Sequence, residues 1–155
     1  MKINGVTQES AYSGGYIIVE REWRKEDTVE LSIVMKPRII TANSRIDAVR
    51  GSIAVEFGPF VYCLEEADNC GINLLDVRIE PDVQIESNWR DDLLSGIKVL
   101  NLPGKVFEED VGELPLYMAV SDNIYQLKDV KLTGIPYYAW ANRGTGQMRV
   151  WIPVV

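Results

Sequence analysis

Hydrophobic and polar residues alternate along most of the chain, and this pattern predicts β-strands. The clearest run covers residues 28–35, where Val29, Leu31, Ile33 and Met35 fall on one face. Similar runs occur at residues 16–21, 38–42, 52–57, 60–65, 76–80, 83–87, 97–102, 125–132, 137–141 and 147–152. About ten short strands without a long helical pattern predict an all-β fold, an antiparallel β-sandwich of jelly-roll type.

Turn-forming residues separate these runs. Asn4-Gly5, Gly14-Gly15 and Gly58-Pro59 each predict a tight turn between strands. Residues 142–146 (NRGTG) predict a hairpin that joins the strands at 137–141 and 147–152. Residues 105–122 are acidic and contain Pro115, so we expect an exposed loop there. We expect one domain over residues 1–155, with a candidate internal boundary within residues 41–50.

Composition excludes several classes of function. The net charge of −7 opposes binding to nucleic acid, and no run reaches the ~20 apolar residues that span a membrane. The first residues do not have the pattern of an export signal. The chain has no histidine and only two cysteines, which removes Ser-His-Asp and Cys-His catalysis and leaves no pattern for a metal site. We therefore expect no metal and no cofactor in the chain itself.

Three stretches, in the same order, resemble the C-terminal region of glycoside hydrolase family 127, which includes bacterial β-L-arabinofuranosidases. The first comprises Asn4-Gly5, residues 15–23 (GYIIVEREW) and residues 27–31 (DTVEL). The second is residues 51–65 (GSIAVEFGPFVYCLE), in which Phe57 stands where the family usually has arginine. The third is residues 132–144 (LTGIPYYAWANRG) followed by residues 148–153 (MRVWIP).

The resemblance implies a piece of a larger enzyme. Enzymes of this family carry an (α/α)6 barrel with a zinc-bound cysteine nucleophile and a glutamate acid/base, and β-sandwich domains are attached to it. The barrel precedes the region that this chain resembles, so the implied zinc belongs to the barrel. Cys63 does not match the family's catalytic or zinc-binding cysteines, and no catalytic residue is carried over. The chain is therefore expected to be cut from a longer protein or to encode a shortened one.

Several residues are candidates for a carbohydrate site, namely Trp89, Tyr138, Trp140 and Arg143. Aromatic faces suit sugar rings, but large aromatics more often lie in a core or a domain interface, which we favour here. Alternation within residues 137–141 would place Tyr138 and Trp140 on one face and Tyr137 on the other. A guanidinium on the tight turn at Arg143 could bind a substrate, although we prefer a structural contact to a nearby Asp or Glu.

The remaining candidates have plain structural interpretations. The acidic residues Glu65, Glu66 and Asp68 could supply the two carboxylates of a glycosidase, but a cluster at a strand end is more often a solvated rim. Another alternative is that this cluster faces the barrel and pairs with a base there. Cys63 is expected to be a small buried residue, and a disulfide with Cys70 stays open.

These observations together predict a non-catalytic accessory and assembly domain of a family 127-like enzyme. Its expected partners are the upstream catalytic barrel and a second copy of the chain, since a domain separated from that barrel exposes apolar surface or a strand edge. The alternative is a carbohydrate-binding module for plant-type oligosaccharides that uses exposed aromatics. A self-sufficient hydrolase with two carboxylates is chemically allowed but is the least plausible of the three.

Overall fold

The structure is a computed structural model that describes residues 1–9, 11–107, 117, 119 and 126–155. It divides into two compact units, Met1–Met35 and Lys36–Val155. The division falls before the boundary considered at residues 41–50, because strand β6 (Pro37–Thr41) pairs along its whole length with β7 (Ser52–Phe57). Within the described ranges no helix is long and apolar enough to cross a membrane.

Unit 1 consists of short hairpins. Strand β1 (Lys2–Ile3) pairs with β2 (Val6–Thr7) and with β5 (Val29–Glu30), and β3 (Ala11–Ser13) pairs with β4 (Tyr16–Ile18). Both predicted turns are confirmed. Asn4 and Gly5 have φ values of 50° and 78°, and Gly14 and Gly15 have φ values of 57° and 84°. Two successive residues at positive φ match the twist of the flanking strands, which explains the Asn-Gly and Gly-Gly pairs.

Asn4 also ties the first turn of unit 1 to β5. Its side-chain oxygen accepts from the Thr28 backbone N–H at 2.9 Å, and its Nδ2 donates to Asp27 at 2.8 Å. The Arg24 backbone N–H, the Asn4 amide and the nearby Arg21 cation lower the pKa of Asp27. Among the residues of this unit whose side chains are described, only Ile3 is buried. Polar contacts therefore hold unit 1 together more than a core does.

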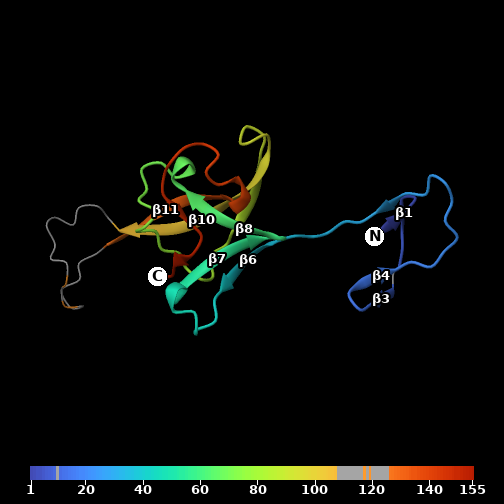
Figure 1. Ribbon diagram of the computed structural model, residues 1–155, viewed down its shortest axis with the longest axis horizontal. Coiled ribbons are helices and arrows are strands. Elements are labelled where there is room, and N and C mark those ends of the chain that lie inside the picture. Colours follow the sequence, from blue (N-terminus) through green and yellow to red (C-terminus); the bar gives the residue numbers. More distant parts are fainter. Residues whose placement is uncertain (10, 108–116, 118, 120–125) are drawn as a thin grey trace. The chain divides into compact units, whose positions relative to one another are not determined.

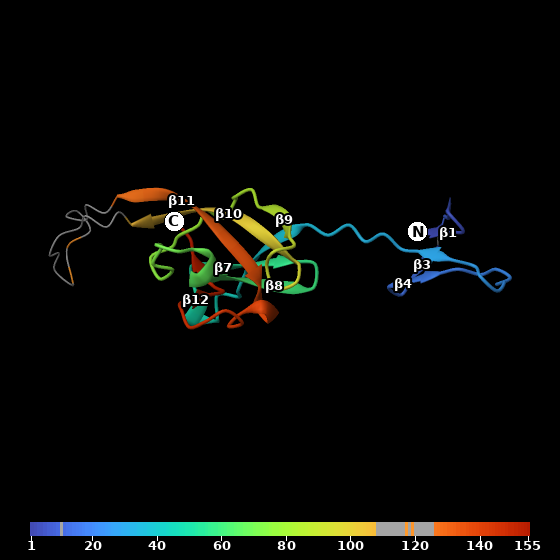
Figure 2. The same cartoon turned by 90° about the horizontal axis from the view of Figure 1, so that it is seen from above.

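Unit 2 is built on one antiparallel sheet (Figure 1). Its strand order is β13-β7-β8-β11-β10-β9, with β6 beside β7 and β12 beside β8. The remaining strands are β8 (Phe60–Glu65), β9 (Glu86–Arg90), β10 (Ile97–Phe107), β11 (Leu127–Pro136), β12 (Met148–Arg149) and β13 (Ile152–Pro153). Strands β10 and β11 are the longest and run side by side (Figure 2).

Period-two patterning places side chains on both faces of this sheet. Leu100 and Leu102 of β10 join the main core, whereas Ile97 and Val99 join a second cluster. The main core also takes in Leu74, Val77 and Ile79 from the connection that precedes β9, each of them completely buried. The sheet and this connection pack around the main core, and the second cluster is a separate apolar group, so the all-β, sandwich-like fold predicted from the sequence is confirmed.

Some predicted strands are shorter or different. Residues 76–80 form only isolated bridges, Arg78 with Lys105 and Ile79 with Val154, instead of a regular strand. The predicted loop at 105–122 begins too early, because β10 continues to Phe107 and pairs there with Leu127. The rest of that predicted loop lies mostly outside the described residues.

The predicted strand at 137–141 is wrong. Strand β11 ends at Pro136, which has no N–H to continue the ladder, and Tyr137–Ala139 form the 3-10 turn η4. The Trp140 N–H donates to the Tyr137 carbonyl at 3.1 Å. Residues 142–146 therefore do not close a hairpin between two strands paired with each other, since β12 pairs with β8 instead. This turn positions the aromatic side chains discussed below.

Candidate functional site

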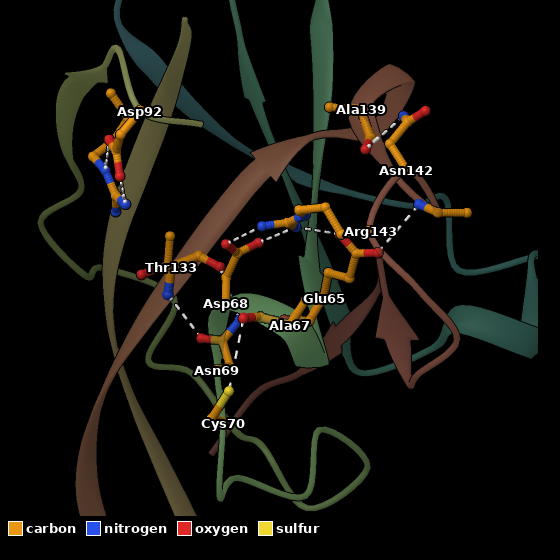
Figure 3. Close-up of polar contacts among 12 residues, drawn as sticks. Glu65, Ala67, Asp68, Asn69, Cys70, Asp92, Thr133, Ala139, Asn142 and Arg143 are labelled. Carbon is orange, nitrogen blue, oxygen red and sulfur yellow. Dashed lines mark hydrogen bonds and ion pairs between the residues drawn. The ribbon is translucent and has the colours of Figure 1, made fainter. Parts of the chain in front are cut away.

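An ion cluster formed by Glu65, Asp68 and Arg143 lies at the end of β8 (Figure 3). Glu65 is the last residue of β8, Asp68 ends the 3-10 turn η2 (Glu66–Asp68), and Arg143 follows η4 by four residues. The chain thus joins residues more than 70 positions apart. We refer to these three residues as the Arg143 cluster.

The guanidinium of Arg143 binds both carboxylates. Its Nη1 and Nη2 donate to the two oxygens of Asp68, each at 2.5 Å, and Nη2 also donates to Glu65 Oε2. The side chains of Glu65 and Asp68 are 4% and 9% exposed, and that of Arg143 is 20% exposed. The third donor, Arg143 Nε, is buried and has no hydrogen-bond partner among the described residues. The Arg143 cluster is therefore a compact, charged element inside the fold.

The contacts with Asp68 and Glu65 shift the pKa of Arg143 upward. The hydrogen bonds to Asp68 raise its pKa most, those to Glu65 add to this, and burial opposes both. The guanidinium keeps its charge at any working pH. Because one fixed cation binds both carboxylates, they do not flank an open space as the two acids of a glycosidase must. The expectation that this acidic cluster is a solvated rim is also wrong for Glu65, which is buried against a cation of the same chain.

The Arg143 cluster also holds the neighbouring turn. Glu65 Oε1 accepts from the Ala141 backbone N–H at 3.1 Å, and Ala141 has a φ of 62°. A non-glycine residue at positive φ is strained and persists only where contacts hold it. On the other side, the Glu66 carboxylate accepts from the Gln147 N–H at 2.7 Å. The preferred interpretation of Arg143 as a contact that fixes its turn agrees with these bonds.

Asn69 completes the polar network, and sequence reasoning missed it. The side chain is buried, its Nδ2 donates to the Glu65 and Thr133 carbonyls at 2.8 and 3.0 Å, and its Oδ1 accepts from the Thr133 N–H at 2.8 Å. The side-chain amide thereby bonds to both backbone groups of Thr133 in β11, as a residue of a neighbouring strand would (Figure 3). No local pattern marks such a residue, because its partner Thr133 lies 64 positions away.

The sequence-predicted carbohydrate residues lie on the surface. Trp89, Tyr138 and Trp140 are 58%, 62% and 39% exposed, so none of them lies in the core of this chain, and of the favoured core or domain-interface placement only the interface stays a prediction. For the last two, the chain has left the sheet at Pro136, so that Tyr138 lies in the turn η4 and Trp140 directly after it. Tyr137 and Trp140, expected on opposite faces, stack with ring centroids 5.7 Å apart, and Tyr138 meets Phe60 edge-on at 5.3 Å.

The structure brings some of these residues together. Tyr138 lines a recess of about 310 Å³ with Ala139 and Asn142 on one side and Leu94, Ser95 and Ile97 on the other. Trp89 does not line the recess, but its ring rests against Gly96, where an added Cβ would lie 2.8 Å from it. The Trp89 Nε1 donates to Asp91 at 2.6 Å. Arg143 holds the turn behind the recess and does not line it.

Phe57, which stands where the resembled family usually has arginine, belongs to the core. It is 6% exposed and meets Tyr62 edge-on with ring centroids 6.5 Å apart. Lys98 Nζ lies 5.2 Å from the centre of the Phe57 ring, so a cation contacts this position from another strand. Burial and the neighbouring Tyr138 raise the pKa of Tyr62 to about 12.

The two cysteines have different environments, and both are free thiols. Cys63 is buried, as expected, and burial together with the charges of Glu65 and Asp68 raises its pKa to about 12. Cys70 is exposed. Because the thiolate is the reactive form, we expect a maleimide at neutral pH to label Cys70 alone in the native protein. Denaturant should then expose Cys63, as followed by mass spectrometry, whereas equal native labelling of both would contradict this.

The described residues do not fit the zinc site implied for the family's barrel. No group of three His, Cys, Asp or Glu side chains that could hold a metal ion occurs among them. The carboxylates of Glu65 and Asp68 are both bound to Arg143. No chemical step in this part of the chain is therefore derived through a metal.

The fold and the site define an all-β domain whose clustered carboxylates are structural. The model of the glycoside hydrolase family 127 C-terminal domain matches residues 37–153, and the chain belongs to this family. That range begins at β6 and covers nearly all of unit 2, and the resemblance noted in the sequence is confirmed.

Similar proteins extend the match over unit 1. The non-reducing end β-L-arabinofuranosidase of Bifidobacterium longum subsp. longum is 30% identical over 154 residues, which are 97% of this chain and 23% of that protein. A GH127 β-L-arabinofuranosidase from Geobacillus stearothermophilus T6 is 34% identical with a TM-score of 0.86, covering 99% of this chain and 24% of that one. A second GH127 β-arabinofuranosidase is 36% identical with a TM-score of 0.82, covering 99% and 23%. The chain thus spans about a quarter of these relatives.

Proposed function

We propose that the chain is a non-catalytic accessory and assembly domain of a family 127 glycoside hydrolase of the β-L-arabinofuranosidase type. The exposed apolar segment at the end of unit 1 carries this proposal. Residues 31–35 follow β5 and pair with no strand in the part of the chain that the structure describes, and their large apolar side chains are 45–84% exposed. An exposed, apolar, period-two segment of this kind favours a partner strand or surface, which we place outside this chain.

The proposed main partner is the catalytic barrel with any sheet that precedes this region in the relatives. Leu31, Ile33 and Met35 fall on one face in the extended chain, so a neighbouring strand could pair with their backbone and cover that face. Zinc, in this proposal, belongs to the barrel and not to this domain. The chain alone, supplied with zinc, should not hydrolyse an aryl β-L-arabinofuranoside, and turnover at the rate of a complete relative would overturn the proposal.

The same exposed segment predicts self-association when the barrel is absent. We expect the wild-type chain to form a dimer or a larger oligomer in sedimentation velocity at concentrations in the range of ~10–100 μM, the range in which weak interfaces associate. The variant Ile33→Glu should shift the population toward monomer, because it places a charge on the apolar face.

A matched control is Leu75→Glu, because Leu75 is a 59% exposed apolar residue of unit 2, outside the segment. This variant should sediment like the wild type. A wild-type chain that stays monomeric over the whole range, or an equal response of the two variants, would contradict the role proposed for residues 31–35.

A second candidate, a carbohydrate-binding module, is favoured by the exposed aromatics at and directly after η4 and by the recess that Tyr138 lines. Exposure of Tyr138 and Trp140 is the feature that separates this candidate from a purely structural domain. The two functions are compatible, since an accessory domain can also hold part of a substrate. Trp89 and Arg143 do not line the recess. If the domain binds carbohydrate, their role is to support the two walls of the recess from behind.

A further inference from the structure

We propose that the recess between η4 and the β9–β10 connection binds one neutral sugar unit of an oligosaccharide. This inference rests on the second candidate function, for which it names the ligand class, and does not depend on the accessory role. The recess is lined by Leu94, Ser95, Ile97, Tyr138, Ala139 and Asn142. Its volume of about 310 Å³ is at the lower end of the range of ligand pockets, which suits one sugar ring with part of a neighbour.

The lining has the chemistry of a neutral sugar site. The aromatic ring of Tyr138 is 62% exposed and can cover the apolar C–H face of a sugar. The Ser95 hydroxyl and the Asn142 amide oxygen can bond to sugar hydroxyls, and the Asn142 Nδ2 is engaged with the Ala139 and Trp140 carbonyls at 2.9 and 3.2 Å. No lining residue is charged, so an acidic sugar would find no counter-ion here.

A larger recess of unit 2 differs from this one because charged residues line it. About 440 Å³ in volume, it is lined in part by Glu80, Lys105 and Asp129. Lys105 Nζ lies 3.4 Å from Glu80 and 3.1 Å from Asp129, so these charges satisfy one another across the recess. It offers no exposed aromatic ring of the kind that Tyr138 presents. The smaller recess is therefore the better sugar site.

Both walls of the smaller recess contain strained backbone. Leu94 and Ser95 have φ values of 49° and 66°, and Ala141, next to Asn142, has a φ of 62°. Successive non-glycine residues at positive φ are uncommon and cluster at binding sites, where the surrounding structure keeps them in place. Here the Ala141 N–H donates to Glu65, which Arg143 fixes. The Arg143 cluster thus positions the wall that carries Tyr138 and Asn142.

The test is a calorimetric or NMR titration of the complete 155-residue chain with a neutral arabino-oligosaccharide of three units. We expect saturable binding with a Kd on the order of 1 mM, because a shallow recess covers about one ring. Tyr138→Ala should weaken binding about tenfold or more. Ser95→Gly, which suits the positive φ, should weaken it about threefold through the lost hydroxyl.

The control variant is Tyr137→Ala, which removes an exposed aromatic of the same turn that does not line the recess. It should bind like the wild type, and a trimer of galacturonic acid should bind at least about tenfold more weakly than the neutral sugar. Absence of wild-type binding, equal losses in the Tyr137 and Tyr138 variants, or preference for the acidic trimer would each overturn the proposal. None of these results would affect the assembly role, which is tested by association and not by sugar binding.

Discussion

Replacing Arg143 with methionine should lower the free energy of unfolding by roughly 3–5 kcal/mol, the usual cost of removing one partner from a buried ion pair. The variant leaves Glu65 and Asp68 unpaired, with side chains only 4% and 9% exposed. It also releases the Glu65 side chain that holds the strained Ala141. Urea denaturation followed by tryptophan fluorescence measures the loss, and the melting temperature should fall by roughly 10 °C or more.

A surface ion pair provides the control for this variant. Arg50 lies 3.1 Å from Asp47, with side chains 67% and 85% exposed. Arg50→Met should change the free energy of unfolding by less than about 1 kcal/mol, since exposed pairs contribute little. If Arg143→Met cost no more than this control while abolishing sugar binding, Arg143 would be a ligand-binding residue and our structural interpretation would be wrong.

Replacing Asn69 with alanine should lower the free energy of unfolding by roughly 2–4 kcal/mol, because it leaves the half-buried Thr133 N–H and two carbonyls without their partner. The amide of Asn69 makes three hydrogen bonds between 2.8 and 3.0 Å in the interior. Hydrogen exchange gives a local measure in addition to global stability. The Thr133 amide should exchange much faster in the variant, relative to other amides of β11.

Asn43 is the matched control, because its exposed side chain makes only a local bond to the Arg45 N–H at 3.0 Å. Asn43→Ala should cost at most about 1 kcal/mol and leave exchange at Thr133 unchanged. Similar losses in both variants would show that the interior network of Asn69 has no special importance.

Local sequence signals predicted the turns at Asn4-Gly5, Gly14-Gly15 and Gly58-Pro59, but the hairpin predicted at residues 142–146 was wrong. Asn4-Gly5 and Gly14-Gly15 adopt the positive φ values that such pairs favour, and Gly58, at a φ of 59°, begins the turn between β7 and β8. Alternation also located β7 and β8 with their observed bounds, although both strands bury consecutive residues and therefore both of their faces. These predictions succeeded where neighbours in the sequence determine the structure.

The sequence-based predictions failed where contacts between residues far apart in the sequence determine the structure. Alternation in residues 137–141 predicted a strand, but Pro136 ends the ladder of β11. Tyr138, in the turn η4, and Trp140, directly after it, are exposed. Asn69 carries no local signal, since its partners come from another strand. Arg143 was the exception, because a guanidinium on a tight turn predicted a contact to an Asp or Glu. The sequence did not show that Glu65 and Asp68 would provide it.

The account depends most on the claim that this chain completes a larger enzyme. The direct test is to remove the matching quarter from a family 127 relative and to mix the remainder with this chain at equal concentrations. Sedimentation velocity should show a one-to-one complex that Ile33→Glu weakens, because the exposed segment of unit 1 would lie in the interface. If the two proteins sediment independently at concentrations of ~100 μM, an interface of ordinary affinity is absent and the account is contradicted.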